Sequence, residues 1–298
     1  MKNIQDFNYH THTERCKHAE KGYNDEEYVK EAFETGIKFL AFTDHIPFMN
    51  TKDTKSNVRM DYDEIDEYLQ SIINLKDKYQ GEINIETGFE FEYFPNEIEH
   101  IMKMKSMVDK MILGQHFVFD SQGNIKYFTS KQEATDKDAI QYICLINKAL
   151  QAGIPDIIAH PDLFFKYRKE FGKKEEFFTR QLCKVIQKYT VPVEINLNEI
   201  YREYVKAQKQ IPDATEQEQI KLAMKTIKYP NEHFWRILSE YDGIKVLFGI
   251  DAHVKGQIRN CKISYKIANE ILGKTIEKLK FVDYKLDEKK SKKEEIEL

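Results

Sequence analysis

The chain carries histidine and carboxylate residues at the ends of short apolar runs, at spacings that suit metal binding. Two histidines form a His-x-His pair near the N-terminus, and an Asp-x-His pair follows an apolar run that ends at Ile250. The residues of this kind at or just after such runs are His10, His12, His18, His45, Glu90, His116, His160, Asp251 and His253. Neutral imidazole and carboxylate groups are ligands that suit Zn²⁺, Mn²⁺ or Fe²⁺. A lone histidine at a strand end is more often a packing residue, but the repetition of the pattern predicts a metal centre.

The size of this set indicates more than one ion. A structural zinc site uses four ligands, usually including cysteine, whereas the four cysteines of this chain form no Cys-x-x-Cys pair. A set this large and without cysteine suits two or three divalent ions that share a carboxylate. Clusters of this kind activate water and stabilise both oxygens of a displacement at phosphorus. We therefore expect a metal-dependent phosphoesterase that needs no serine or cysteine nucleophile.

Alternating strands and helices must position these side chains. Short β-branched or aromatic runs predict strands over residues 6–10, 39–45, 84–91, 110–116, 156–160, 192–196 and 245–251. Helical periodicity between them predicts helices over residues 25–35, 63–79, 132–152, 175–189, 216–227, 233–241 and 264–272. This alternation predicts an α/β fold, either a doubly wound parallel sheet or a barrel with crossover helices. In a barrel the C-terminal ends of all strands face one rim, where active sites are built.

Composition and the remaining segments limit the partners. The chain has 46 Lys and Arg against 50 Asp and Glu, a net charge of −4, so we expect no nucleic-acid partner. No apolar run reaches the ~18 residues of a membrane span, and the scattered cysteines favour a cytoplasmic protein. We expect one domain over residues 1–284, a solvated or disordered charged tail over 285–298, a hairpin over 117–128 and a helical insertion over 203–228. Nothing in the sequence predicts the oligomeric state.

The motifs around the candidate ligands resemble those of the PHP superfamily (polymerase and histidinol phosphatase). The matching pieces are Tyr9-His10-Thr11-His12-Thr13, His18, Phe42-Thr43-Asp44-His45, Gly88-Phe89-Glu90, Gly114-Gln115-His116, Ala159-His160-Pro161-Asp162 and Gly249-Ile250-Asp251-Ala252-His253. Their order and the chain length look most like the stand-alone histidinol-phosphatase branch. The resemblance implies a distorted (β/α)7 TIM-like barrel with a trinuclear metal site at the C-terminal rim of the strands.

The resemblance also implies how the ligands divide among three sites. The implied sets are His10, His12, Glu90 and Asp251 for the first metal, Glu90, His116 and His160 for the second, and His18, His45 and His253 for the third. Glu92 is a rival to Glu90 as the bridging carboxylate, since it lies two residues further along the same strand. Glu90 is preferred because it follows Gly-Phe, as in the family motif.

The activity that the resemblance implies is hydrolysis of a small phosphate monoester, with histidinol phosphate as the expected substrate. Another sugar or nucleotide phosphate, a phosphotyrosyl protein and a DNA end remain alternative substrates for the same chemistry. A non-catalytic metal-binding regulatory domain is the alternative from another class. The expected catalytic residues are Asp44, Glu90 and Asp251, with Asp44 orienting a ligand or shuttling a proton.

Residues that follow the fifth and sixth predicted strands are expected to contact the substrate. Arg168 and Arg202 are expected to bind the phosphate, because an arginine can contact it in a bidentate manner. Lys166 is a rival to Arg168. Asn196 ends the one predicted strand that carries no metal ligand, and we expect it to bind substrate.

Overall fold

A parallel sheet with helices outside it forms the body of the protein. The computed structural model describes residues 5–50, 58–128 and 134–283. Within these ranges, an eight-stranded sheet follows the order of the chain and all of its strand pairs are parallel. Its strands are β1 (Phe7–Asn8), β2 (Phe39–His45), β3 (Asn84–Phe91), β4 (Lys110–Leu113), β7 (Ile157–Ile158), β8 (Val193–Asn196), β9 (Lys245–Gly249) and β10 (Lys280–Phe281). The predicted α/β class and the predicted strands are confirmed.

The two ends of the sheet meet and make it a barrel. Just beyond β1 and β9, Thr11 and Ala252 form a parallel bridge. In this bridge His12 N donates to the Ala252 carbonyl at 2.8 Å, and Ala252 N donates to the His10 carbonyl at 3.2 Å. At the opposite end of the barrel, β10 pairs with β9. The barrel is therefore closed by β1 and β9 at its C-terminal rim but not at its other end, in line with the expected distorted barrel. Strand β10 is a short additional strand that the sequence did not predict.

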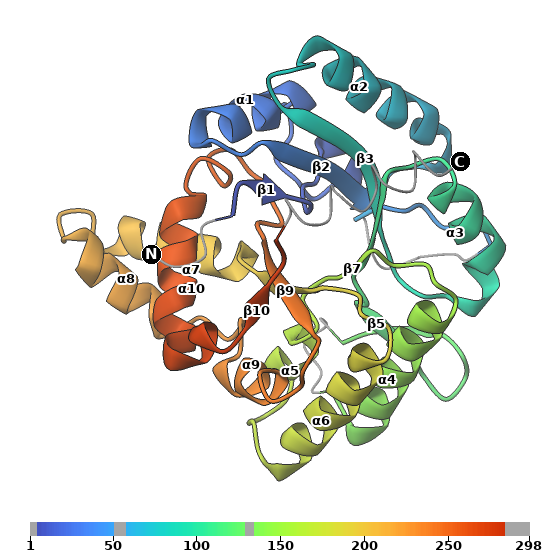
Figure 1. Ribbon diagram of the computed structural model, residues 1–298, viewed down its shortest axis with the longest axis vertical. Coiled ribbons are helices and arrows are strands. Elements are labelled where there is room, and N and C mark those ends of the chain that lie inside the picture. Colours follow the sequence, from blue (N-terminus) through green and yellow to red (C-terminus); the bar gives the residue numbers. More distant parts are fainter. Residues whose placement is uncertain (1–4, 51–57, 129–133, 284–298) are drawn as a thin grey trace.

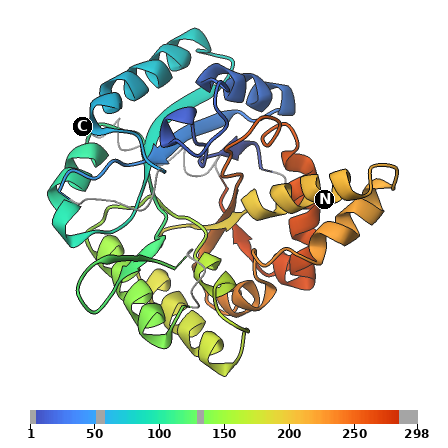
Figure 2. The same ribbon diagram turned by 180° about the vertical axis from the view of Figure 1, so that it is seen from behind.

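Helices form an outer ring around the strands (Figure 1, Figure 2). They are α1 (Asp25–Thr35), α2 (Ile65–Lys78), α3 (Ile98–Lys105), α4 (Asp136–Gln151), α5 (Leu163–Lys166), α6 (Lys173–Gln187), α7 (Asn198–Gln210), α8 (Glu216–Met224), α9 (Glu232–Leu238) and α10 (Cys261–Leu272). Their buried faces follow the helical period, as in α2, where Tyr68, Ile72 and Leu75 are buried. Helix α1 ends at Gly36 with a φ of 83°, a left-handed conformation that glycine adopts without strain.

Alternation along the strands separates an inner from an outer apolar layer. On β2, Ala41 belongs to the inner layer, whereas Leu40 and Phe42 pack in the layer between sheet and helices. Successive side chains of a strand point to opposite faces, so the same alternation turns His45 at the end of β2 to the inside. The apolar interior of the barrel therefore leads directly to polar side chains at the rim.

Several strands end earlier than predicted. Strand β1 ends before His10, β4 before His116, β7 before His160 and β9 before Asp251, so these four side chains lie in the loops that follow the strands. The backbone φ is 29° at His160 and 53° at Asp251. A left-handed backbone cannot continue a parallel ladder, which explains why these two strands stop where the candidate ligands begin.

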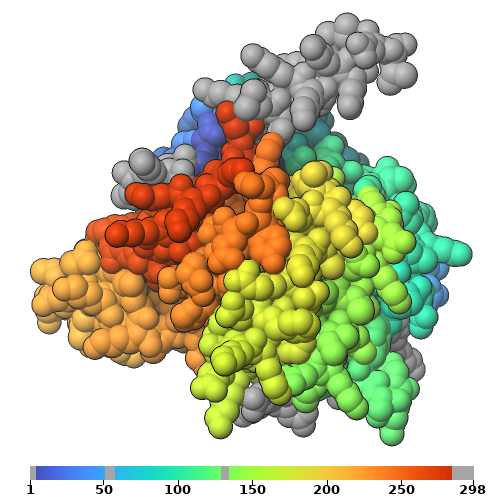
Figure 3. Space-filling view, turned by 60° about the horizontal axis from the view of Figure 1, so that its bottom comes forward, coloured from blue at the N-terminus to red at the C-terminus, as the bar shows by residue number. Residues whose placement is uncertain are grey.

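Two segments outside the main sheet were predicted with different success. The predicted hairpin is confirmed, with β5 (Phe117–Phe119) antiparallel to β6 (Ile125–Tyr127). The predicted helical insertion over 203–228 is in fact two helices, α7 and α8, and the first begins at Asn198. They extend outward from the barrel beside α10 (Figure 1, Figure 3). The polar sequence of this pair follows from that exposed position.

Further predictions concern the ends of the chain and the membrane. The single domain over residues 1–284 stays a prediction, and the predicted charged tail over 285–298 lies outside the described residues. Among the helices of the described ranges, none combines the length and the apolar character that crossing a membrane requires.

Candidate metal centre

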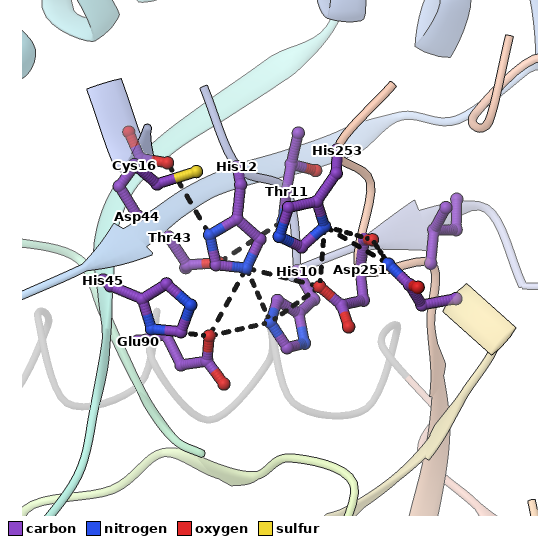
Figure 4. Close-up of polar contacts among 12 residues, drawn as sticks. His10, Thr11, His12, Cys16, Thr43, Asp44, His45, Glu90, Asp251 and His253 are labelled. Carbon is purple, nitrogen blue, oxygen red and sulfur yellow. Dashed lines mark hydrogen bonds and ion pairs between the residues drawn. The ribbon is translucent and has the colours of Figure 1, made fainter. Parts of the chain in front are cut away.

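The predicted ligands converge at the C-terminal rim of the barrel, as expected for side chains that follow parallel strands. They come from β2, β3 and the loops after β1, β4, β7 and β9. Most of them are buried, with Glu90 only 1% exposed and His10 and His12 not exposed at all. Figure 4 shows polar atoms turned toward one another from His10, His12, His45, Glu90, Asp251 and His253.

Glu90 lies at the middle of this cluster. Its Oε1 lies 2.9 Å from His160 Nε2 and 3.7 Å from His116 Nε2. Its Oε2 lies 3.2 Å from His45 Nδ1 and 3.4 Å from Nε2 of both His10 and His12. One buried carboxylate is thus surrounded by the nitrogens of imidazole rings from different strands, which is the arrangement expected of a bridging ligand.

Gly114 makes room for the Glu90 carboxylate. A Cβ atom at this position would lie 1.7 Å from Glu90 Oε1. Gly114 of the Gly114-Gln115-His116 motif is therefore a glycine because a larger side chain would collide with Glu90, which the sequence alone did not reveal.

Asp251 and His253 form a second side of the cluster. Asp251 Oδ1 lies 3.3 Å from His12 Nε2, 3.5 Å from His10 Nε2 and 3.2 Å from His253 Nδ1. His253 Nε2 lies 2.7 Å from His18 Nε2. His18 follows the short 3₁₀ helix η1 (Glu14–Cys16), and its Nδ1 lies 2.9 Å from the Cys16 carbonyl oxygen.

The donor atoms of this cluster fit divalent metal ions. Two pairs of ring nitrogens face each other, His10 Nε2 and His12 Nε2 at 3.1 Å and His18 Nε2 and His253 Nε2 at 2.7 Å. Lone pairs that face each other repel unless a proton or a cation lies between them. Four groups of three donors are close enough to hold an ion: His10, His12 and Glu90; His45, Glu90 and His116; His10, His160 and Asp251; and His12, Cys16 and His253. These groups contain every predicted ligand except His18, and they add Cys16, which was not predicted.

The electrostatics of the cluster favour a bound cation. Burial alone would raise the pKa of Glu90, but His45, His10 and His116 outweigh it and hold that pKa well below its usual range. Burial lowers the pKa of His18 and of His253 to about 4, with a contribution from neighbouring imidazoles. Burial also acts to lower the pKa of His10, but Glu194, Asp251 and Glu90 raise it overall. Ionised Glu90 and neutral His18 and His253 are in the states in which these groups bind metal. The raised pKa of His10 reflects the negative charge of the carboxylates around it, which a bound cation would neutralise.

A layer of carboxylates lies behind the ligands, and sequence reasoning found only part of it. Glu92, considered as a rival bridge, accepts two hydrogen bonds from Arg59 at 2.7 and 2.8 Å, and it lies 3.1 Å from His116 Nδ1. Glu92 therefore holds His116 from behind rather than facing the centre. Glu194 was not predicted, although its Oε2 lies 2.7 Å from His10 Nδ1. The one available signal was its position, two residues before the strand-end Asn196.

Asp44, predicted as catalytic, is fully buried beside the ligands. Its carboxylate accepts hydrogen bonds from the Thr13 backbone at 2.6 Å and from the Thr13 hydroxyl, and Oδ1 lies 3.7 Å from His12 Nδ1. Burial raises the pKa of Asp44 to about 7. The contacts are those of a residue that fixes the loop carrying His12, one of the two roles expected for it.

The predicted substrate residues have different surroundings. The Asn196 amide is buried, and its Nδ2 donates to Glu194 Oε1 at 2.6 Å and to Asp251 Oδ2 at 3.1 Å. The Arg168 guanidinium binds Asp136 and Glu175, each at 2.6 Å. Arg202 is exposed on α7. The structure thus brings Asn196 into contact with Asp251, a predicted metal ligand, and gives Arg168 two carboxylate partners.

Comparisons with known proteins agree with this site. A family model described as the PHP domain matches residues 8–198. The chain is 28% identical over 167 residues to a Deinococcus radiodurans protein named "Probable histidinol-phosphatase", covering 55% of this chain and 61% of that protein. It is 32% identical over 119 residues to the histidinol-phosphatase of Bacillus subtilis, covering 37% of this chain and 43% of that protein. The match therefore spans less than two thirds of either relative.

Solved structures share the fold. The hisK protein of Listeria monocytogenes superposes with a TM-score of 0.68 at 18% identity, over 87% of this chain and 99% of that one. Histidinol phosphate phosphatase of Lactococcus lactis, solved with zinc, L-histidinol and phosphate, gives a TM-score of 0.59 at 16% identity, over 90% of this chain and 93% of that one. With the predicted motifs gathered at one rim and the PHP pattern matched over more than half of its length, the chain belongs to the PHP family.

Proposed function

We propose that the chain is a metal-dependent phosphatase that hydrolyses histidinol phosphate to histidinol and phosphate. The observation that carries the proposal is the buried Glu90 carboxylate, with the nitrogens of five imidazole rings 2.9 to 3.7 Å from its oxygens. The curated relatives named as histidinol-phosphatases support the substrate, as does the Lactococcus structure that contains histidinol and phosphate.

The cluster is proposed to hold two or three divalent ions, with Zn, Mn and Fe as the candidates. When bound, such ions supply an activated water and neutralise charge on the phosphoryl oxygens. Glu90 is shared between sets because each of its oxygens faces different histidines, Oε1 facing His116 and His160 and Oε2 facing His10, His12 and His45. His253 Nε2 lies 2.7 Å from His18 Nε2, and the rings of His18 and His45 lie 5.3 Å apart, so these three histidines are proposed to hold a further ion, as the resemblance implies.

The substrate is proposed to lie against a surface formed by α5, α7 and the segment before α9. We call this surface the α5–α7 wall and define it by Lys166, Arg168, Glu199, Arg202 and Tyr229. Helices α5 and α7 follow β7 and β8, so the wall stands on the same rim as the ligands. Lys166 Nζ lies 2.9 Å from Glu199 Oε1 and 4.9 Å from the centre of the Tyr229 ring.

Arg202 is the better proposed phosphate contact of the two predicted arginines. It lies four residues after Asn198 on α7, so both residues share one face of the helix. Asn198 Nδ2 donates to the Asp251 carbonyl at 2.7 Å, which places that face beside the ligand cluster. Arg168, by contrast, has its guanidinium bound to Asp136 and Glu175.

The test is an assay of phosphate release with measured metal content. Purified protein, loaded with Zn²⁺ or Mn²⁺, is assayed on histidinol phosphate beside sugar phosphates, nucleotide phosphates, a phosphotyrosyl peptide and 3′-phosphorylated DNA. We expect release from histidinol phosphate, and we expect His12→Ala to abolish it. The matched control is His233→Ala, because His233 is exposed and lies outside the cluster. Release from other esters alone would overturn the substrate, and activity that survives His12→Ala would overturn the mechanism.

A further inference from the structure

Strand β8 carries no predicted metal ligand, yet it has two polar side chains that are fully buried beside the cluster. Glu194 and Asn196 each have 0% exposure. They lie two residues apart, so they point to the same face of the strand. A buried carboxylate is costly unless its oxygens accept hydrogen bonds, and the partners of Glu194 show what this carboxylate does.

Each oxygen of Glu194 has one partner connected with the metal cluster. Oε2 lies 2.7 Å from His10 Nδ1, and Oε1 accepts from Asn196 Nδ2 at 2.6 Å. The same Asn196 Nδ2 donates to Asp251 Oδ2 at 3.1 Å. Glu194 and Asn196 thus connect His10 to Asp251, two ligands that the PHP motifs assign to one metal.

The orientation of the Asn196 amide is fixed by its other end. Asn198 N donates to Asn196 Oδ1 at 2.9 Å. With the oxygen of the amide accepting this bond, both hydrogens of Nδ2 are left for the carboxylates of Glu194 and Asp251. Every donor therefore faces an acceptor along the chain of hydrogen bonds from His10 through Glu194 and Asn196 to Asp251.

The contact with Glu194 determines which nitrogen of His10 is available to a metal. A carboxylate only accepts hydrogen bonds, so the short contact requires a proton on His10 Nδ1. The neutral ring then has its lone pair on Nε2. That atom faces Glu90 Oε2 at 3.4 Å, Asp251 Oδ1 at 3.5 Å and His12 Nε2 at 3.1 Å.

The neighbouring strand leaves space for this carboxylate. In the parallel pairing of β8 with β9, Gly249 lies beside Asn196. A Cβ atom on Gly249 would lie 2.1 Å from both Cδ and Oε2 of Glu194. The glycine of the Gly249-Ile250-Asp251 segment is thus explained by the position of Glu194.

We propose that Glu194 is a positioning residue for the first metal, one that fixes the proton on His10 Nδ1 and, through Asn196, aligns Asp251. The proposal rests on the metal-binding function proposed above. It also gives Asn196 a role behind a ligand, in place of the substrate contact expected from its position at a strand end. Outer partners of this kind typically change metal affinity by about 10–100-fold when they are removed.

The experiment measures Zn²⁺ affinity in Glu194→Ala and Glu194→Gln by competition with a chromophoric chelator. We expect Glu194→Ala to weaken the tightest Zn²⁺ site by about 10–100-fold. Glu194→Gln keeps the shape, but its amide accepts at only one of its two ends, so the loss should be smaller. The control is Glu97→Gln, because Glu97 is also fully buried, and the hydrogen bonds that it accepts from described residues come from the backbone of Met49 and Asn50, away from the cluster.

A second measurement separates positioning from a merely structural role. Nitrogen-15 NMR of histidine-labelled, Zn²⁺-loaded protein reports which ring nitrogen of His10 carries the proton. We expect Nδ1–H in the wild type and in Glu97→Gln, and a changed Nδ1 signal in both Glu194 variants. Wild-type Zn²⁺ affinity together with an unchanged His10 signal in Glu194→Ala would overturn the proposal.

Failure of the proposed function gives a different result. A wild-type protein that binds Zn²⁺ in a Glu194-dependent manner but hydrolyses no phosphate ester supports the positioning role and overturns the function. A wild-type protein that binds no Zn²⁺ overturns both.

Discussion

The ligand cluster and the α5–α7 wall stand on the same rim, but their polar groups are arranged in opposite ways. In the cluster, ring nitrogens face each other at 2.7 and 3.1 Å and surround ionised carboxylates. In the wall, two of the three cations already have carboxylate partners, with Lys166 bound to Glu199 and Arg168 bound to Asp136 and Glu175. The donor atoms of the cluster therefore favour added cations, whereas most of the positive charge of the wall is already neutralised and Arg202 is the cation that stays exposed.

This difference bears on how an anionic substrate is bound. With a net charge of −4 and two of the three cations of the wall paired, Arg202 is the main positive charge that the wall offers to a phosphate. Under the proposed function, most of the charge that attracts the phosphoryl group would then come from bound metal ions, which the composition does not count. The experiments below test this division between a cluster that depends on metal and a wall that does not.

Loss of a cluster ligand should have the largest effect. We expect Asp251→Ala to reduce kcat/KM for the phosphate ester by more than about 100-fold, beyond the range for an outer partner. The reason is that Asp251 Oδ1 lies within 3.5 Å of both His10 and His12, so its loss removes one of the two carboxylates that face Nε2 of these rings. Phosphate release and metal content are measured together. A variant with normal metal content and normal turnover would contradict the assignment.

Removal of metal should destabilise the whole protein. An ion at 100 times its dissociation constant stabilises the folded state by about 2.7 kcal/mol. For a chain of this size we expect chelation to lower Tm by about 4 °C for each ion that is lost, and added Zn²⁺ or Mn²⁺ to restore it. Circular dichroism of metal-free and metal-loaded protein checks this. The same Tm in both states would show that the cluster is stable without cations.

The convergence of the predicted ligands could be expected from the sequence because their positions follow from the local pattern of apolar runs. Apolar runs locate the strands, and parallel strands bring their C-terminal ends to one rim, so residues as distant as His10 and Asp251 could be expected to meet. The motifs shared with the PHP superfamily then assigned these residues to three metal sites. The same reasoning located the ends of α1 and the hairpin of β5 and β6.

The layer behind the ligands could not be predicted in this way. Glu194 meets His10 across 184 positions of sequence, and its role depends on the side chain that faces it from the loop after β1 and on the space left by Gly249. Arg59 is similar, because its bond to Glu92 depends on where the loop after β2 returns to the barrel. Strand β10 was missed because two residues carry too little pattern.

Filling the space beside Glu90 should have an intermediate effect. In Gly114→Ala the new methyl group would lie 1.7 Å from Glu90 Oε1, so the carboxylate must move. We expect a loss of about 10–100-fold in metal affinity, comparable to the loss of an outer partner. The control is Gly172→Ala, where the nearest atom would be 3.5 Å away, an ordinary contact. Equal metal affinity in the two variants would mean that Glu90 is not a ligand.

The smallest effect on activity should come from Arg168, the arginine of the wall that already has carboxylate partners. Arg168 binds Asp136 and Glu175 and also donates to the Ala134 carbonyl, so it joins the start of α4 to α6. We expect Arg168→Met to cost about 1–2 kcal/mol of stability, since Glu175 loses a charged hydrogen-bond partner, while KM for the phosphate ester stays within about twofold. Arg202→Met should do the reverse, raising KM with little change in Tm, because Arg202 is exposed on α7. Urea denaturation and steady-state kinetics of both variants separate the two roles. A raised KM in Arg168→Met would return Arg168 to the phosphate site and contradict the view that Asp136 and Glu175 already neutralise its charge.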